Sequence, residues 1–321
     1  MKCTRCRASA EINLRSHHAS FCRPCFILYF QRQVERTIKK ERMFTPEERL
    51  LVAVSGGKDS LALWDVLIVQ GYQTTGLYLD LGIGGYSIRS REKVEQFSSA
   101  RQVPLQVVSL AEEAIPVPTA AQFTNRVPCA ACGMMKRHFF DQYAIEGGFT
   151  VLATGHNLDD EAARLLGNVL HWQTEYLARE KPVLEPTHPR FVRKVRPLYR
   201  LSELETAVYS FFRGIDYAIE ECPNSVGASQ LFYKEMLNKI EAQMPGTKLT
   251  FVQEFVRSAQ PLFVAPDGTP PRECEVCGMP SFGPICSFCR LIQEVDRKRE
   301  KQRSAQSRQS LTLHDATELE S

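Results

Sequence analysis

The sequence contains no run of apolar residues long enough to cross a membrane, although its apolar content is ordinary for a globular protein. Charged residues and cysteines occupy its first positions, where a secretory signal peptide would place an apolar segment. These two absences predict a cytoplasmic protein without a membrane partner. The formal net charge of +3 is also too small to indicate, by itself, a polyanionic partner.

A Walker-type phosphate loop is missing too, yet a glycine-rich turn suited to phosphate is present. In Ser55–Ser60 (Ser-Gly-Gly-Lys-Asp-Ser), Lys58 is followed by Asp59, and no glycine stands five positions before Gly57. The apolar run Leu50–Val54 predicts a buried strand before the turn, and a helix is expected after it. Such a unit points backbone N–H groups and the positive end of a helix dipole at one place. The alternative is a turn that needs glycine only for steric reasons.

From Leu50 onward the sequence alternates between strand-like and helix-like segments. Strands are predicted at 50–54, 75–80, 105–110, 150–154 and 217–219, and helices at 61–70, 88–101, 134–145, 202–214, 229–243 and 250–258. This alternation predicts an α/β fold, a twisted parallel sheet with helices on both faces. Ligands of such sheets bind at the carboxyl ends of strands, so Ser55–Ser60, Leu79–Asp80 and Gly155–Asp160 are expected to converge.

The eleven cysteines fall into two outer sets of four and a central remainder of three. Each outer set consists of two Cys-x-x-Cys pairs: Cys3, Cys6, Cys22 and Cys25 in one, and Cys274, Cys277, Cys286 and Cys289 in the other. Inside a cell, this spacing predicts that each set holds a structural Zn²⁺ ion in a tetrahedral thiolate site. The remaining cysteines are Cys129, Cys132 and Cys222, the first two on a loop between predicted elements.

Five segments are predicted along the chain. They are a zinc knuckle (1–26), a basic linker helix (27–48), a catalytic domain (49–265), a zinc ribbon (270–292) and a basic, then acidic tail (293–321) expected to be a frayed helix followed by disorder. Basic residues are concentrated in the linker helix and again between Arg190 and Arg200. A basic helix beside a zinc knuckle suits a nucleic-acid backbone, and a solvated surface is the alternative.

These motifs occur in an order that resembles one enzyme family. The turn Ser55–Ser60 is similar to the PP-loop of ATP pyrophosphatases, which cleave ATP between its α and β phosphates. Further motifs are Cys129-x-x-Cys132, Thr154–Asp160 (Thr-Gly-His-Asn-Leu-Asp-Asp) and Glu221–Asn224 (Glu-Cys-Pro-Asn). With the two outer cysteine sets, nearly the whole chain resembles TtuA-type tRNA 2-thiouridine synthetases, relatives of the TtcA-type PP-loop tRNA thiolases.

The resemblance implies an ATP-dependent tRNA sulfurtransferase with the PP-loop ATP-pyrophosphatase (adenine nucleotide alpha hydrolase-like) fold. Such an enzyme adenylates the 2-oxygen of the T-loop uridine, at the ribothymidine position, and replaces that oxygen with sulfur. The family's donor is a ubiquitin-like sulfur-carrier protein with a C-terminal thiocarboxylate. No sulfur-donating domain such as a rhodanese is visible in the sequence, in agreement with a separate donor. The resemblance also implies a homodimer.

The implied cofactors are ATP, Mg²⁺, two Zn²⁺ ions and a [4Fe-4S] cluster on Cys129, Cys132 and Cys222. The residues expected to hold the nucleotide are Ala53, Ser55, Gly56, Gly57, Lys58, Asp59, Ser60, Leu79 and Gly155. Asp59 would aid Mg²⁺ or shape the turn, and the backbone of Ala53 and Leu79 would contact adenine. Asp160 is expected to be a Mg²⁺ ligand or a proton acceptor, and Lys136 to contact phosphate. Their structural alternatives are a first-turn acid and a solvated lysine.

Three thiolates on a four-iron cube leave one iron without a protein ligand, and our hypothesis is that this iron carries the sulfide. One alternative is a persulfide on Cys132 or Cys222 without a cluster, and another is a set of inert, buried thiols. For the whole protein, the alternatives are a PP-loop thiolase acting on wobble uridine or a cytidine, and an RNA-binding scaffold with a vestigial nucleotide fold.

Overall fold

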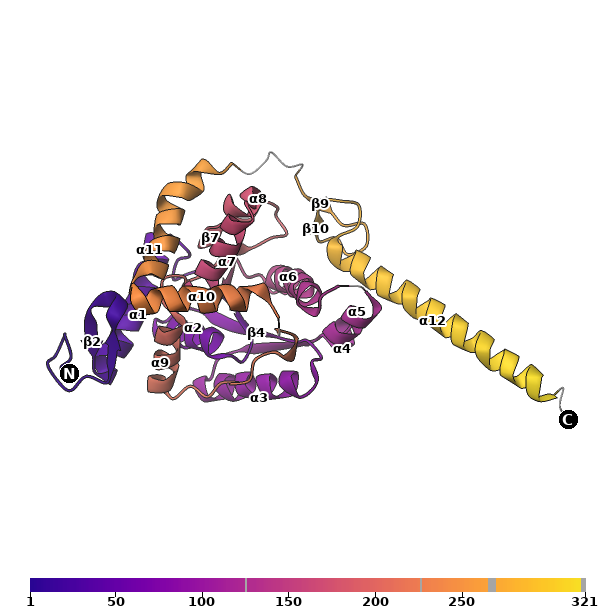
Figure 1. The fold of residues 1–321 in the computed structure, drawn as a ribbon, viewed down its shortest axis with the longest axis horizontal. Helices are drawn as coiled ribbons and strands as arrows, with labels where there is room; N and C mark the ends of the chain where they lie inside the picture. The colour runs from indigo at the N-terminus through magenta and orange to yellow at the C-terminus, as the bar shows by residue number, and fades with distance from the viewer. Residues whose placement is uncertain (125, 226, 265–269, 319–321) are drawn as a thin grey trace.

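A six-stranded sheet with the order β5-β4-β3-β6-β8-β7 forms the centre of the protein (Figure 1). The structure, a computed structural model, describes residues 1–124, 126–225, 227–264 and 270–318, without the side chains of 307–318. The strands are β3 (Leu50–Val54), β4 (Thr74–Asp80), β5 (Leu105–Ser109), β6 (Val151–Thr154), β7 (Val183–Leu184) and β8 (Arg193–Val195). Neighbouring strands from β5 to β8 run parallel, and the edge strand β7 runs antiparallel to β8. The predicted fold class is therefore confirmed.

Helices cover both faces of this sheet. They are α1 (Arg23–Lys40), α2 (Lys58–Val69), α3 (Gly84–Arg101), α4 (Leu110–Glu113), α5 (Val117–Phe123), α6 (Pro128–Glu146), α7 (Leu158–Leu170), α8 (Thr174–Leu177), α9 (Glu203–Arg213), α10 (Ser229–Gln243), α11 (Thr247–Glu254) and α12 (Ser287–Glu318). Successive strand residues point to opposite faces. Val52 accordingly packs in the core shared with α1, α2, α7 and α9, whereas Leu51 packs with α5, α6 and α12.

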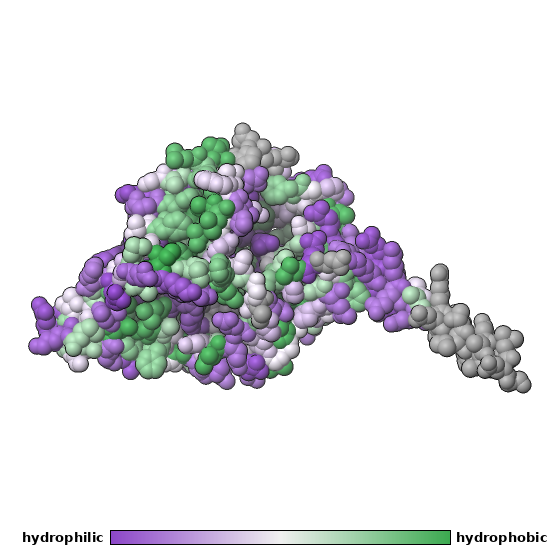
Figure 2. Space-filling view, in the orientation of Figure 1, coloured by the Kyte–Doolittle hydropathy of each residue, from purple (hydrophilic) through white to green (hydrophobic). Residues whose placement is uncertain are grey.

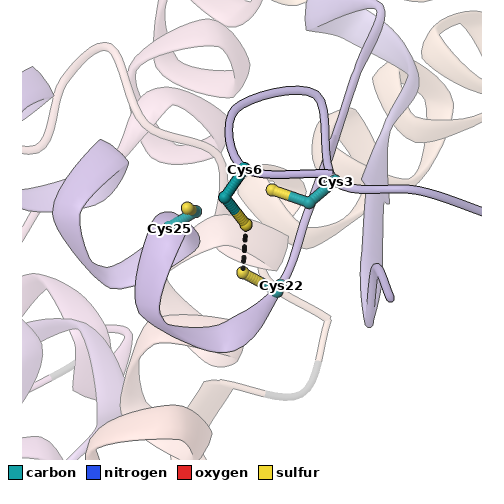
Figure 3. A group of neighbouring side chains, drawn as sticks. All are labelled: Cys3, Cys6, Cys22 and Cys25. Atoms are coloured by element: carbon teal, nitrogen blue, oxygen red, sulfur yellow. Dashed lines mark hydrogen bonds between the residues drawn. The ribbon is translucent and has the colours of Figure 1, made fainter. Parts of the chain in front are cut away.

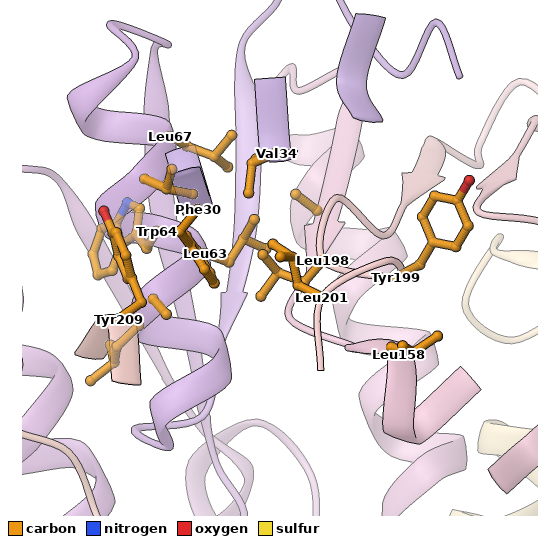
Figure 4. Close-up of a cluster of buried hydrophobic side chains, with 14 of the residues drawn as sticks. Phe30, Val34, Leu63, Trp64, Leu67, Leu158, Leu198, Tyr199, Leu201 and Tyr209 are labelled. Carbon is orange, nitrogen blue, oxygen red and sulfur yellow. The ribbon is translucent and has the colours of Figure 1, made fainter. Parts of the chain in front are cut away.

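The helix expected to be a basic linker is part of the main core. Phe30 and Val34 of α1 are fully buried, and the Phe30 ring stacks on Tyr209 of α9 with 4.1 Å between centroids (Figure 4). Trp64 of α2 is also fully buried and donates its indole N–H to Thr74 at 3.0 Å. The apolar side of α1 thus fixes this helix to the sheet domain, and its basic side chains occupy the outer side.

Small two-stranded sheets accompany the two outer cysteine sets. β1 (Ile12–Leu14) pairs with β2 (Ala19–Phe21) near the amino terminus, and β9 (Arg272–Glu273) pairs with β10 (Pro280–Ser281) before α12. In Figure 1 the two sets lie on opposite sides of the central domain, and α12 extends away from it as a single arm. Within the described residues no helix is long and apolar enough to span a membrane.

Several predicted boundaries were wrong, and the most important concerns α6. This helix begins at Pro128, so Cys129 and Cys132 lie in its first two turns and not on a loop. Proline suits a first helical turn because its missing N–H has no partner there. Residues 217–219 form no strand, although the Ala218 N–H donates to the Gly56 carbonyl at 2.9 Å.

The carboxyl-terminal segment is more helical than predicted. The tail, expected to be a frayed helix followed by disorder, is helical in α12 as far as Glu318. It is rich in good helix formers, and its described side chains are hydrophilic (Figure 2). Lys298 and Glu294 form an i,i+4 ion pair at 2.9 Å. The predicted end of the catalytic domain at residue 265 lies outside the described residues.

A buried carboxylate joins three helices on one face of the sheet. Asp65 of α2 has no exposed side-chain surface and accepts hydrogen bonds from Arg101 of α3 and Arg213 of α9, each at 2.8 Å. The Tyr209 hydroxyl also donates to Asp65 at 2.8 Å. Losing Asp65 would therefore remove the carboxylate that these two cations share.

We expect Asp65→Ala to lower the free energy of unfolding by about 3 kcal/mol, since a buried ion-pair network loses its shared partner. Urea denaturation followed by circular dichroism measures this change. Asp216→Ala is the matched control, because Asp216 is 69% exposed and pairs with Lys93 on the surface. The control should change stability by less than about 0.5 kcal/mol. Equal losses in both variants would contradict the role of Asp65.

The amino-terminal knuckle is anchored to α9 by a titratable pair. His17 lies 3.4 Å from Glu205, which is almost fully buried and also accepts from the Tyr29 hydroxyl at 2.7 Å. The hydrogen bond to Glu205 raises the pKa of His17 above its ordinary value of 6.5, although burial opposes it. A raised histidine pKa adds stability that is complete below the ordinary pKa and lost as pH rises through the raised one.

His17→Asn should therefore lower the melting temperature at pH 6 by about 2 °C relative to wild type. The difference should shrink as the pH rises through the raised pKa of His17. Thermal melts between pH 6 and 9 test this, with His18→Asn as the neighbouring control. A difference between wild type and His17→Asn that does not vary with pH would refute the ion pair's contribution.

Candidate functional site

The central site is a cavity of about 300 Å³ at the carboxyl ends of β3, β4 and β6. Strands β4 and β5 follow β3 toward one edge of the sheet, whereas β6 lies on its other side. The order therefore reverses between β3 and β6, where α/β sheets bind ligands. Predicted residues that line the cavity are Ala53, Ser55, Asp59, Ser60, Leu79, Lys136, Gly155 and Asp160, and Gly56, Gly57 and Lys58 belong to the same loop.

The PP-loop is held in its shape by its own hydroxyl groups and by one left-handed glycine. Ser60 donates to the Gly57 carbonyl at 3.0 Å and accepts from the Ser55 N–H at 3.1 Å. Gly56 has a φ of +81°, and a Cβ atom there would lie 2.6 Å from the Ser90 carbonyl oxygen. A side chain is therefore excluded at Gly56 by both backbone conformation and space.

A second glycine lets the turn after β6 approach the PP-loop. A Cβ atom on Gly155 would lie 2.8 Å from the backbone nitrogen of Ser60. No side chain fits at that distance, so the two turns meet through backbone alone. The predicted convergence of Ser55–Ser60 with Gly155–Asp160 is what the geometry shows.

Asp59 ties the PP-loop to its neighbours. Its Oδ1 accepts from the Asn157 side chain at 3.0 Å and from the Thr206 hydroxyl of α9. Its other oxygen lies 3.1 Å from the Lys58 ammonium. Of the two roles expected for Asp59, these contacts favour shaping of the turn.

The first turn of α7 contains a capping box. Asn157 accepts from the N–H groups of Asp159 and Asp160, and the Asp160 side chain accepts from the Asn157 N–H at 3.1 Å. Asp159 is buried and paired with the Lys248 ammonium at 2.5 Å. Asp159 is thus a structural acid, whereas Asp160 keeps one side toward the cavity.

Two residues that the sequence did not suggest complete the polar side of the site. Lys234 of α10 lies 2.5 Å from Asp160 and 3.4 Å from Glu203 of α9, and Glu203 also accepts from Lys58 at 2.6 Å. Burial raises the pKa of Asp160, but the charge and hydrogen bond of Lys234, together with His156 and the Asn157 N–H, outweigh burial and lower that pKa overall. Lys234 and Glu203 do not belong to a local sequence motif, so the sequence analysis could not identify them.

The three central cysteines come together beside this cavity. The Cys129 thiol donates to the Asn224 carbonyl at 3.1 Å, which joins the first turn of α6 to the segment after Cys222. Cys132 and Cys222 both pack against the core that contains α6. Burial raises the pKa of the Cys132 thiol, and the Lys136 ammonium partly offsets this. In the described structure the three sulfur atoms are not gathered within 4.8 Å, unlike those of the outer sets.

Lys136 connects the cysteines with the cavity. It lines the cavity and lies one helical turn after Cys132, close enough for its charge to lower the pKa of that thiol against the effect of burial. Tyr86 also lines the cavity, and burial raises its pKa, with a further contribution from Cys222. A group bound by the cysteines and a ligand of the cavity would therefore be neighbours.

The two outer cysteine sets each have the geometry of a site for one metal ion. Within each set the four sulfur atoms lie within 4.8 Å of one another. Figure 3 shows Cys3, Cys6, Cys22 and Cys25 pointing toward a common centre, with 3.5 Å between the sulfur atoms of Cys6 and Cys22. Four thiolates converging in this way suit a tetrahedral ion.

Two family profiles match the chain. Residues 28–227 match the "PP-loop domain", and residues 2–27 match "2-thiouridine synthetase TtuA, N-terminal LIM domain". The chain is 48% identical over 304 residues to a protein of Thermus thermophilus named "tRNA-5-methyluridine(54) 2-sulfurtransferase", covering 94% of each chain. It is 41% identical to a Pyrococcus horikoshii protein of the same name, covering 93% of this chain and 96% of the relative.

A more distant relative and a solved structure agree on the fold. The chain is 30% identical to "Cytoplasmic tRNA 2-thiolation protein 1" of Bos taurus, covering 97% of this chain and 92% of the relative. The structure titled "U34-tRNA thiolase NcsA from Methanococcus maripaludis with its [4Fe-4S] cluster" superposes with a TM-score of 0.75 at 24% identity, covering 92% and 96% of the two chains. That identity supports the fold alone. The family profiles and the two sequence relatives match this chain over nearly its full length. The chain therefore belongs to the TtuA-type 2-thiouridine synthetases of the PP-loop family, a family of transferases.

Proposed function

We propose that this protein is an ATP-dependent tRNA 2-sulfurtransferase that thiolates the T-loop uridine at position 54, the position in the names of its relatives. The observation that carries the proposal is the position of Lys136. This residue lines the nucleotide-sized cavity and lies one helical turn after Cys132, so one site can combine nucleotide chemistry with sulfur chemistry. An RNA-binding scaffold with a vestigial nucleotide fold would not require a nucleotide cavity beside a cysteine. The T-loop target itself rests on the relatives, because no contact in the site selects a uridine.

The reaction has two transfers. In the first, the uridine 2-oxygen attacks the α-phosphorus of ATP, and pyrophosphate leaves. In the second, a sulfur nucleophile attacks the ring carbon C2, which bears that oxygen, and AMP leaves with the oxygen. The PP-loop N–H groups and Lys58 would bind the phosphates and stabilise charge on the leaving pyrophosphate. The backbone of Ala53 and Leu79, at the ends of adjacent strands, would contact adenine.

The role of Asp160 follows from its surroundings. Lys234 holds the Asp160 carboxylate in its ionised form at neutral pH and makes it a weak base. A Mg²⁺ ligand needs an ionised carboxylate, whereas a proton acceptor works best with a pKa near the working pH. Of the two expected roles, we therefore favour Asp160 as a ligand of the Mg²⁺ ion that accompanies ATP.

Cys129, Cys132 and Cys222 would hold a [4Fe-4S] cluster, and the fit rests on their geometry. They are neighbours at the edge of the cavity, and their sulfur atoms are more widely spaced than a site for one ion requires. A cube of four irons is wider than one ion, so this spacing suits it. When bound on three cysteines, a cluster supplies one iron that can hold an external sulfide. A persulfide on Cys132 or Cys222 remains the alternative.

The proposal includes partners and further metals. A ubiquitin-like thiocarboxylate protein would deliver sulfur, tRNA would be the substrate, and the enzyme would act in the cytoplasm as a homodimer. The two outer sets would hold Zn²⁺, because the four sulfur atoms of each set lie close together and four thiolates make a closed structural zinc site.

The test is a thiolation assay with anaerobically purified protein, unmodified and methylated tRNA, ATP, Mg²⁺ and a sulfide source. Wild type should release AMP and form 2-thiolated T-loop uridine, measured by mass spectrometry of digested tRNA. Lys58→Ala should lower the rate by about 100-fold, since it removes a charge at the phosphates. Lys239→Ala, on the exposed side of α10, is the control and should keep the wild-type rate. Sulfur found only at the wobble uridine or a cytidine would support the alternative target.

Substitution of each central cysteine tests the cluster. Cys129→Ser, Cys132→Ser and Cys222→Ser should each lose iron and labile sulfide from the anaerobically prepared protein. Cys6→Ser should keep iron and lose zinc, because it belongs to the amino-terminal set. Metal content by mass spectrometry measures both effects. Wild-type protein without iron that still thiolates tRNA would reject the cluster in favour of a persulfide.

A further inference from the structure

Glu203 lies between two lysine ammonium groups beside the PP-loop. One oxygen of its carboxylate accepts from Lys58 at 2.6 Å, and the other lies 3.4 Å from Lys234. Each lysine also has a second acid, Asp59 for Lys58 and Asp160 for Lys234. A carboxylate that uses both oxygens to bridge two lysines offers the charge and the oxygen spacing that a phosphate group offers. The same two lysines could therefore bind one phosphate.

Lys234 is built into the site. Its side chain is 19% exposed, and its second partner Asp160 lines the cavity. Lys58 belongs to the loop whose N–H groups face the phosphates. Because Glu203 touches both ammonium groups, Lys234 lies within reach of any phosphate-sized anion that Lys58 binds. This places a second positive charge at the PP-loop from α10, outside the motif.

Glu203 has the freedom to leave this position. Its side chain is 37% exposed, and it lines a second cavity of about 430 Å³ beside the amino-terminal knuckle. Its backbone is fixed, because the Glu203 N–H donates to Asp159 at 2.8 Å. Rotation of the side chain alone would carry the carboxylate away from the lysines and toward solvent.

We propose that Lys234 is a second pyrophosphate-binding lysine, and that Glu203 is a built-in competitor that occupies both lysines until phosphates displace it. The inference rests on the proposed ATP-dependent function and adds a residue from outside the PP-loop. With Lys58 and Lys234 on the β and γ phosphates, two ammonium groups would neutralise the leaving pyrophosphate.

The test is calorimetric titration of anaerobically purified, metal-containing full-length protein with inorganic pyrophosphate in Mg²⁺ buffer. Lys234→Ala should weaken pyrophosphate binding by about tenfold, because a charge-assisted contact is lost. Glu203→Gln should tighten it by about threefold, because the competing charge is removed. AMP titrations should give the wild-type affinity in Lys234→Ala, which separates lost phosphate contacts from a disturbed cavity.

Matched controls come from the same helix. Lys239 and Glu235 of α10 form an exposed i,i+4 pair at 2.8 Å, so Lys239→Ala and Glu235→Gln should leave pyrophosphate binding unchanged. Lys234→Arg keeps the charge and should retain more affinity than Lys234→Ala. Should Lys234→Ala fail to fold, Glu203→Gln still decides the matter.

Two results would overturn the inference. One is wild-type pyrophosphate affinity in Lys234→Ala, and the other is unchanged or weaker binding in Glu203→Gln, which would make Glu203 a support for the site and not a competitor. Either result, with ATP binding intact in wild type, leaves the proposed function standing. A wild-type protein that binds neither ATP nor pyrophosphate would instead remove the proposed function, and this inference with it.

Discussion

The site depends on a close approach between two turns that belong to different halves of the sheet. Gly155, after β6, lies so near Ser60 that a side chain would collide with the PP-loop backbone. Asp59 strengthens the same junction by accepting from Asn157 and Thr206. These contacts lock the β3–α2 unit to the β6–α7 unit across the point where strand order reverses. The cavity therefore exists because two glycines allow backbone to pack where side chains cannot.

Helix α6 brings the cysteine chemistry to the same place. Cys132 and Lys136 lie one turn apart, so one helical face presents both a thiol and an ammonium group to the cavity side. The carboxyl-terminal cysteine set supports this helix from behind. Phe288, between Cys286 and Cys289, stacks on His138 of α6 with 3.9 Å between centroids, and Leu291 of α12 is fully buried against the same core. A metal in that set would thus stabilise the platform on which the central cysteines sit.

The sequence revealed those parts of the site that are local in the chain. The PP-loop, the turn after β6 and the cysteine pairs each place their chemistry within a few residues, so spacing alone identified them. It did not reveal Lys234 and Glu203, because their pairing depends on how α10 and α9 pack against the PP-loop. Short strands were missed by the sequence analysis for a related reason. β8 has three residues in a basic stretch, and tertiary pairing with β6, not local pattern, makes it a strand.

Charge balance links the polar residues of the site to the need for a divalent cation. Around the PP-loop, the carboxylates of Asp59, Asp160 and Glu203 share the two ammonium groups of Lys58 and Lys234, an excess of one negative charge. A triphosphate adds several more. If Lys58 and Lys234 bind the phosphates, Asp160 loses the ammonium group that balances its charge. The bound triphosphate also makes the site more negative. Two lysines cannot neutralise both sets of oxygens, so in the proposed function a Mg²⁺ ion held by Asp160 would supply the positive charge that the lysines lack.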